Sequence, residues 1–156
     1  RRWVNIPLGD IANKQGRVAG RNIGGGAMIF PGIVGAQSFK VFDLEVAATG
    51  LDEREAAESG FHPVSMVSWG NAIAGSMPGN TKLGLKLIAD RATGKLLGAQ
   101  AVGKAGAVSR INTLSCALWA GLTLDDIGYL DLAYAPPFGG SWDLIHIAAQ
   151  ALKRQL

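Results

Sequence analysis

The sequence predicts an α+β fold in which an antiparallel sheet carries helices packed on one side. After an N-terminal helix, strand-like patterns come first and amphipathic helical patterns fill the last third of the chain. A clear apolar–polar alternation at residues 81–88 indicates a half-buried strand, which is typical of antiparallel sheets. A hydrophobic content of 48% over 156 residues is enough for a buried core.

The first element is predicted to be a helix that begins at Asp10, whose side chain can act as the N-cap. Its apolar side would contain Ile11, Val18, Ala19 and Ile23, together with Gln15. The glycines at 24–26 end this helix, because three successive glycines carry a large backbone entropy cost. The glycine run is the one plausible boundary along the chain.

The next segment is predicted to alternate between short strands and short helices. Residues 36–42 are rich in β-favouring side chains and are expected to form a strand. Asp43 then predicts a short helix over residues 44–48, closed by Gly50.

A capping box formed by Asp52 and Glu55 predicts a second short helix, with Gly60 as its C-terminal stop. A strand is expected over residues 64–69, followed by a turn at residues 78–80.

The central hairpin has the clearest strand pattern. Leu83, Leu85 and Leu87 are expected on the buried face, and Lys82 and Lys86 on the solvated face. A short loop at residues 90–94 should lead into the partner strand, residues 96–102.

The last third is predicted to be helical. Val108, Ile111, Leu114 and Leu118 form an apolar stripe over residues 105–120, and Thr123 with Asp126 caps the next helix. Residues 135–137 cannot be helical because of their two prolines. Ser141 is expected to cap a final helix with an apolar face of Leu144, Ile145, Ala148, Ala149 and Leu152.

The residues do not indicate a self-sufficient active site. The sequence lacks a GxGxxG loop after a strand and a GxxxxGK[ST] loop. The single cysteine, Cys116, excludes an internal disulfide and a CxxC pair, and its helical context predicts a buried, inert thiol. His146 is expected to be a hydrogen-bonded packing residue and His62 a solvated loop residue, so no metal site is expected.

Charge and hydropathy exclude two classes of partner. The net charge is +3 and the basic residues outside the N-terminal helix are scattered, which is unlike a nucleic-acid-binding surface. The sequence also lacks an apolar run long enough for a membrane span.

Several ordered stretches together resemble the FAD-dependent pyridine nucleotide–disulfide oxidoreductases. Residues 7–20 (PLGDIANKQGRVAG) resemble the helix that follows the second flavin-contacting strand of that family. The matches to its C-terminal dimerisation domain are FPG at 30–32, KVFDLE at 40–45, GKLLGAQ and VGK within 94–104, and DLAYAPPF with WD within 131–143. The resemblance is nearest to the branch of coenzyme A–disulfide reductases and NADH oxidases.

The resemblance implies that residues 1–29 are the remainder of a flavin domain and residues 30–156 a dimerisation domain. In this family the domain pairs with its twin, and the loop at Tyr134–Pro137 faces the flavin and redox cysteine of the partner subunit. Tyr134 is therefore the implied catalytic residue, acting in trans. FAD and NAD(P)H are the implied cofactors of the parent enzyme.

The resemblance also implies contacts with the flavin. Ala12, Asn13 and Lys14 would lie on the flavin side within one subunit, where the N-terminus of their helix could favour negative charge. Without the rest of that domain they should form an ordinary exposed helical turn. Pro136 and Phe138 would lie against the flavin of the partner subunit.

Three positions differ from related enzymes. Ala135–Pro136 replaces the histidine–proline element of glutathione reductase relatives, which disfavours glutathione-type chemistry. Ser76–Met77 stands where coenzyme A–disulfide reductases have a second tyrosine, and Arg110–Ile111 keeps two residues of a lysine–arginine–isoleucine motif. The oxidant therefore stays open among coenzyme A disulfide, polysulfide, oxygen and peroxide.

Two functions remain open. One is the homodimerisation domain of a flavin- and NAD(P)H-dependent disulfide reductase or NADH oxidase, and the other is a freestanding α+β binding or scaffold module without redox activity. A first residue of Arg1 and the absence of a signal-peptide pattern favour a piece of a longer, cytoplasmic protein. We expect the chain to self-associate and to hold neither cofactor by itself, because no phosphate-binding loop is present.

Overall fold

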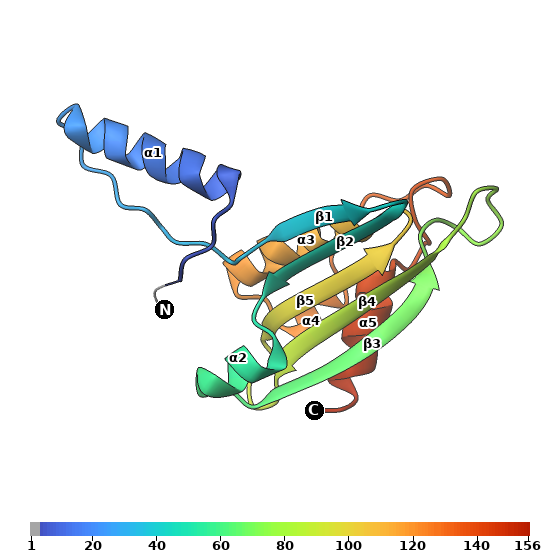
Figure 1. Ribbon diagram of the computed structural model, residues 1–156. Helices are drawn as coiled ribbons and strands as arrows, with labels where there is room; N and C mark the ends of the chain where they lie inside the picture. The colour runs from blue at the N-terminus through green and yellow to red at the C-terminus, as the bar shows by residue number, and fades with distance from the viewer. Residues whose placement is uncertain (1–3) are drawn as a thin grey trace. The chain divides into compact units, whose positions relative to one another are not determined.

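The computed structural model describes residues 4–156, which divide into two compact units after Gly35. The unit before this point contains one helix, α1 (Gly9–Ile23). The second unit, residues 36–156, contains the remaining elements (Figure 1). Their order is β1 (Gln37–Val41), β2 (Leu44–Gly50), α2 (Glu53–Glu58), β3 (Pro63–Asn71), β4 (Lys82–Asp90), β5 (Leu96–Gly103), α3 (Ala107–Ala120), α4 (Leu124–Ile127) and α5 (Leu144–Lys153).

Helix α1 starts slightly earlier than the sequence predicts. Leu8, with extended backbone angles, is the N-cap residue, so the prediction that Asp10 caps the helix is wrong. Asp10 lies within the first turn, where its negative charge is favourable near the helix N-terminus. The helix ends at Gly24, as the glycine run predicts, and Gly25 follows with a φ of 84°.

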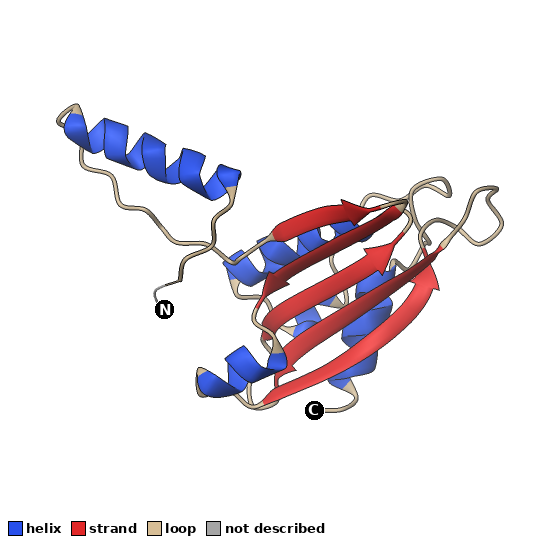
Figure 2. Ribbon diagram, viewed as in Figure 1, coloured by secondary structure: helices blue, strands red, loops and turns tan. Residues whose placement is uncertain are grey.

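The second unit is built on one five-stranded sheet with the order β1-β2-β5-β4-β3 (Figure 2). All four strand pairs are antiparallel. The central hairpin of β4 and β5 joins the β1–β2 hairpin on one side to β3 on the other. This arrangement confirms the predicted antiparallel α+β fold.

Strand β2 corrects the prediction of a short helix over residues 44–48. The segment pairs on both sides, with Val46 opposite Phe39 of β1 and Val102 of β5. Phe42 adopts a left-handed φ of 52°, which closes the tight β1–β2 turn that the sequence pattern does not indicate. Pairing with two flanking strands outweighs the weak helical preference of this five-residue segment.

The main core lies between the sheet and the helices α3, α4 and α5, which cover one face (Figure 1). Leu83, Leu85 and Leu87 of β4 are completely buried against this layer, as their alternation predicts. The buried helix residues that meet them include Ile111, Leu114, Leu124, Ile127, Leu144, Ile145, Ala148 and Leu152. The predicted apolar faces of α3 and α5 are thus confirmed.

A smaller cluster covers one end of the opposite sheet face. Ile88 is completely buried there with Leu97 and with Ala56 of α2, so the predicted wet face of β4 is only partly solvated. Helix α2 begins with the predicted capping box of Asp52 and Glu55.

The ends of the C-terminal helices are fixed by side chains. Thr123 and Asp126 form the predicted capping box of α4, and hydrogen bonds from the side chain and backbone of Thr123 lower the pKa of Asp126. Helix α5 is capped by Asp143, so the prediction of Ser141 is wrong by two residues. Each helix from residue 4 onward is too short or too polar to cross a membrane.

Candidate functional site

The candidate site is the long loop between α4 and α5, which contains the implied catalytic residue. Tyr134 is 53% exposed and Phe138 is 78% exposed, and Pro136 between them is also exposed. Aromatic side chains are enriched where protein surfaces contact a partner. The loop is therefore shaped to present its aromatic side chains outward.

The backbone of this loop is fixed by hydrogen bonds despite its exposure. The amides of Phe138 and Gly139 donate to the carbonyl of Ala135 at 2.9 and 3.3 Å, which makes a compact turn around the two prolines. The carbonyl of Pro136 accepts a 3.0 Å bond from the amide of Ala74, in the connection between β3 and β4. Residues far apart in the sequence therefore hold the tip of the loop.

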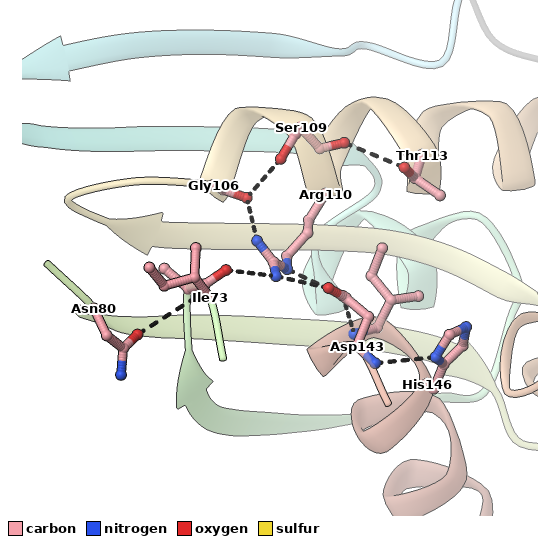
Figure 3. A network of polar contacts seen from close by, with 10 residues as sticks. Ile73, Asn80, Gly106, Ser109, Arg110, Thr113, Asp143 and His146 are labelled. Atoms are coloured by element: carbon pink, nitrogen blue, oxygen red, sulfur yellow. Dashed lines mark hydrogen bonds and ion pairs between the residues drawn. The ribbon is translucent and has the colours of Figure 1, made fainter. Parts of the chain in front are cut away.

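At the C-terminal end of the loop, Arg110 of α3 and Asp143 form an ion pair that is largely shielded from water (Figure 3). Arg110 Nε donates to Asp143 Oδ1 at 3.0 Å, and Nη2 donates to Oδ2 at 2.6 Å. The guanidinium also donates to the carbonyls of Gly106 at 3.1 Å and Ala72 at 3.0 Å. Arg110 is only 5% exposed and needs such partners, because an unpaired buried charge is strongly unfavourable.

His146 joins the two ends of the loop. Its Nδ1 accepts a 3.1 Å bond from the amide of Asp143, so its Nε2 carries the proton and donates to the carbonyl of Leu130 at 2.9 Å. Trp142 packs edge-on against both His146 and Tyr129. The sequence-based prediction of a hydrogen-bonded packing histidine is confirmed.

The implied flavin-side residues lie in the other unit. Ala12, Asn13 and Lys14 are all exposed on α1, and Lys14 pairs with Asp10 at 3.3 Å. The amide of Ala12 already donates to the carbonyl of Leu8 at 3.1 Å. The side chains of these residues could therefore contact a ligand, whereas the amide of Ala12 is already hydrogen-bonded within the helix.

The prediction for Cys116 is wrong, because its side chain is exposed. It lies on α3 between Leu114 and Ala117, but faces away from the stripe that these residues bury. His62 is exposed, as predicted. Within residues 4–156, no group of three His, Cys, Asp or Glu side chains is placed to hold a metal ion.

The sequence reasoning missed Asp143 as a partner of Arg110. One local signal was available, since Arg110 precedes Leu114 by four residues and so lies on the same side of the helix. A cation on a buried helix face requires an anion nearby. The second signal was Asp143 itself, a favoured N-cap residue directly before Leu144, two residues after the predicted cap Ser141.

The chain is similar to known proteins along most of its length. It is 41% identical to the NAD(P)H sulfur oxidoreductase (CoA-dependent) of Pyrococcus furiosus, over 96% of this chain and 34% of that protein. It is 34% identical to the coenzyme A disulfide reductase of Staphylococcus haemolyticus, over 92% of this chain and 32% of that protein. The structure of an NAD-dependent persulfide reductase from A. fulgidus superposes with a TM-score of 0.94 at 39% identity, over 97% of this chain and 28% of that one.

The chain thus spans about a third of the length of its curated relatives. Residues 36–145 match the family described as pyridine nucleotide-disulphide oxidoreductase, dimerisation domain. This segment includes every strand of the sheet, the helices α2 to α4 and the loop that carries Tyr134. The chain therefore belongs to the dimerisation domain family of the pyridine nucleotide-disulphide oxidoreductases.

Proposed function

We propose that this chain is the interface domain of a flavin- and NAD(P)H-dependent disulfide reductase, and that it pairs with a second copy of itself. In that dimer, the loop Tyr134–Pro137 of one subunit would lie at the active site of its partner. The observation that carries the proposal is the pair of exposed aromatic side chains, Tyr134 and Phe138, on a loop whose backbone is held at several points. A pre-ordered aromatic surface loses little entropy when a partner covers it.

The other residues implied by the family resemblance could touch a flavin, but they do not form a pocket that would hold one. Ala12, Asn13 and Lys14, like Pro136 and Phe138, form open surface, and none of them encloses a ligand by itself. In the full-length enzyme, FAD would pass electrons from NAD(P)H to the substrate. We propose that residues 1–29 belong to the flavin domain and residues 30–156 to the interface domain. The second compact unit and the family match both begin at residue 36, six residues after the proposed start of the interface domain, which supports a boundary in this part of the chain.

The substrate we propose is a sulfur–sulfur bond, in a disulfide, persulfide or polysulfide that involves coenzyme A. The named relatives from Pyrococcus, Staphylococcus and A. fulgidus act on sulfur compounds according to their names. Reduction of such a bond leaves negative charge on a sulfur atom. The phenol of Tyr134 can donate one hydrogen bond to that charge, while its ring packs at the interface.

The experiment that tests this role is Tyr134→Phe in the full-length enzyme that contains this segment. The substitution keeps the ring and deletes the donor, so kcat and kcat/KM should both fall by roughly tenfold or more, which corresponds to about 1.4 kcal/mol. The dimer dissociation constant, measured by analytical ultracentrifugation, should change little because the apolar area is the same.

Tyr129→Phe is the matched control, because Tyr129 is an exposed tyrosine that packs against Trp142 from outside the 134–137 loop. It should leave both quantities unchanged. Unaltered turnover of Tyr134→Phe with disulfide, persulfide and oxygen as acceptors would remove Tyr134 from the active site. Weaker association at normal turnover would instead indicate a structural tyrosine.

A further inference from the structure

We propose that Arg110 and Asp143 are positioning residues that fix the Tyr134–Phe138 loop in the orientation needed by the partner subunit. The proposal rests on the function proposed above for Tyr134. None of the hydrogen bonds made by Arg110 and Asp143 goes to Tyr134 or Phe138. The ion pair acts on the loop through two segments that contact both the pair and the loop: the β3–β4 connection and the residues that lead into α5.

The first connection runs through the β3–β4 segment. Arg110 Nη2 donates to the carbonyl of Ala72 at 3.0 Å, immediately after β3 ends. Two residues later the amide of Ala74 donates to the carbonyl of Pro136. The whole β3–β4 connection is closed at its base, because the amide of Ala72 donates to the carbonyl of Thr81 at 2.9 Å. The position of Arg110 is therefore transmitted to the tip of the loop by a short, hydrogen-bonded stretch of backbone.

The second connection runs through the chain itself. Gly139 follows Phe138 directly and is buried against the ion pair: a Cβ at this position would lie 3.3 Å from Asp143 Oδ2 and 4.0 Å from Arg110 Nη2. Asp143 in turn accepts the amide of Ile145 at 2.9 Å and donates its own amide to His146. The same carboxylate thus starts α5, pairs with Arg110 and supports the C-terminal side of the loop.

The chemistry of the pair suits positioning better than a surface salt bridge would. Arg110 uses a planar fork against both oxygens of Asp143, which fixes direction as well as distance (Figure 3). With the Gly106 and Ala72 carbonyls, the guanidinium makes four hydrogen bonds to three separate segments. Lysine could keep the charge but not this geometry.

The test uses Asp143→Asn and Arg110→Lys in this chain, with hydrogen–deuterium exchange followed by mass spectrometry. Asn is a good N-cap and can still accept the amide of Ile145, so α5 should persist in Asp143→Asn. We expect exchange in peptides covering 72–81 and 131–142 to accelerate by roughly tenfold or more, while β4 and β5 stay protected. Glu53→Gln is the matched control, because it removes the charge that pairs Glu53 of α2 with Lys86 of β4. It should leave the exchange rates of both peptides unchanged.

A spectroscopic measurement reports on Tyr134 itself. The sequence has two tyrosines, so 3-fluorotyrosine labelling gives two ¹⁹F resonances, and Tyr134→Phe assigns them. The Tyr134 resonance should shift or broaden in both ion-pair variants and stay in place in Glu53→Gln. Unchanged exchange and an unmoved resonance would overturn the proposal, as would an equal loss of protection across the whole sheet.

Neither measurement depends on turnover. A null result here would therefore leave the kinetic test of Tyr134→Phe standing, and a failure of that kinetic test would leave this one interpretable.

Discussion

Glu45→Ala should destabilise the second unit, because Glu45 caps a helix that is distant in sequence. Helix α3 begins after Gly106, which has no side chain to cap it, and its first turn contains no acidic residue. Glu45 of β2 supplies the missing acceptor: its Oε2 accepts the amides of Ala107 at 2.9 Å and Val108 at 3.3 Å. Removing it leaves two helix N-terminal amides without that partner.

The magnitude follows from two contributions. Loss of a side-chain cap costs about 1 kcal/mol in typical helices. Loss of a carboxylate at the positive end of the helix dipole costs roughly 0.3–1 kcal/mol more, and the upper part of this range applies to a half-buried group such as Glu45. Glu45→Ala should therefore reduce the free energy of unfolding by about 1.5–2 kcal/mol. Glu45→Gln keeps an acceptor oxygen and should lose only about 0.5–1 kcal/mol.

The assay is urea unfolding followed by far-UV circular dichroism, at one fixed protein concentration because dimerisation would add to the apparent stability. Glu58→Ala, an exposed glutamate at the end of α2, is the control and should change the free energy of unfolding by less than about 0.5 kcal/mol. A Glu45→Ala effect no larger than this control would refute the capping role. Equal effects of Glu45→Ala and Glu45→Gln would refute the assignment of part of the energy to the capping hydrogen bonds, because Gln loses the charge and keeps an acceptor oxygen.

Two further predictions concern stability. Gly98→Ala should unfold the sheet or lower the free energy of unfolding by roughly 3 kcal/mol, since its Cβ would lie 2.0 Å from the backbone oxygen of Leu51. Gly79 has a φ of 78° and open space around it, so Gly79→Ala should cost only about 1–2 kcal/mol in the same urea assay. Asp90 accepts hydrogen bonds from the Thr93 hydroxyl and the His62 amide, and these bonds hold its pKa below the ordinary value. The contribution of the Asp90 carboxylate to stability is therefore present above about pH 4 and is lost as the pH falls further. Asp90→Asn should flatten the decline of the urea midpoint below pH 4, and parallel profiles would contradict this.

The sequence was sufficient for elements with a long or strict period. The three leucines of β4 and the apolar stripes of α3 and α5 follow directly from periods of 2 and 3.6, and the capping boxes of α2 and α4 need residues only three apart. The short segment at β2 is a different case. Its local pattern fits a helix after Asp43, and only the pairing with β1 and β5 makes it a strand.

Long-range caps and pairs lie beyond such periodicity. The local sequence places Glu45 in a predicted helix, although its side chain caps α3 by accepting the amide of Ala107, 62 residues away. The exposure of Cys116 was predictable in principle, because a residue two positions after buried Leu114 points to the other side of a helix. The apolar composition of the whole helix favours burial, whereas the angular position of Cys116 around the helix axis decides its exposure.

The ion pair at the C-terminal end of the Tyr134 loop marks how far sequence reasoning can go at this site. Arg110 lies four residues before Leu114, on the side of α3 that is buried, and a buried guanidinium requires an anion. The existence of a partner could therefore have been predicted from the helical spacing. The chain has 12 acidic residues, and helical periodicity does not select among them. Asp143 is selected by the fold, since only the return of the chain from α4 to α5 brings the cap of α5 beside α3. Because that same return places Tyr134 on the surface, the ion pair and the exposed loop are two results of one chain path, and a change in either should be detectable at the other.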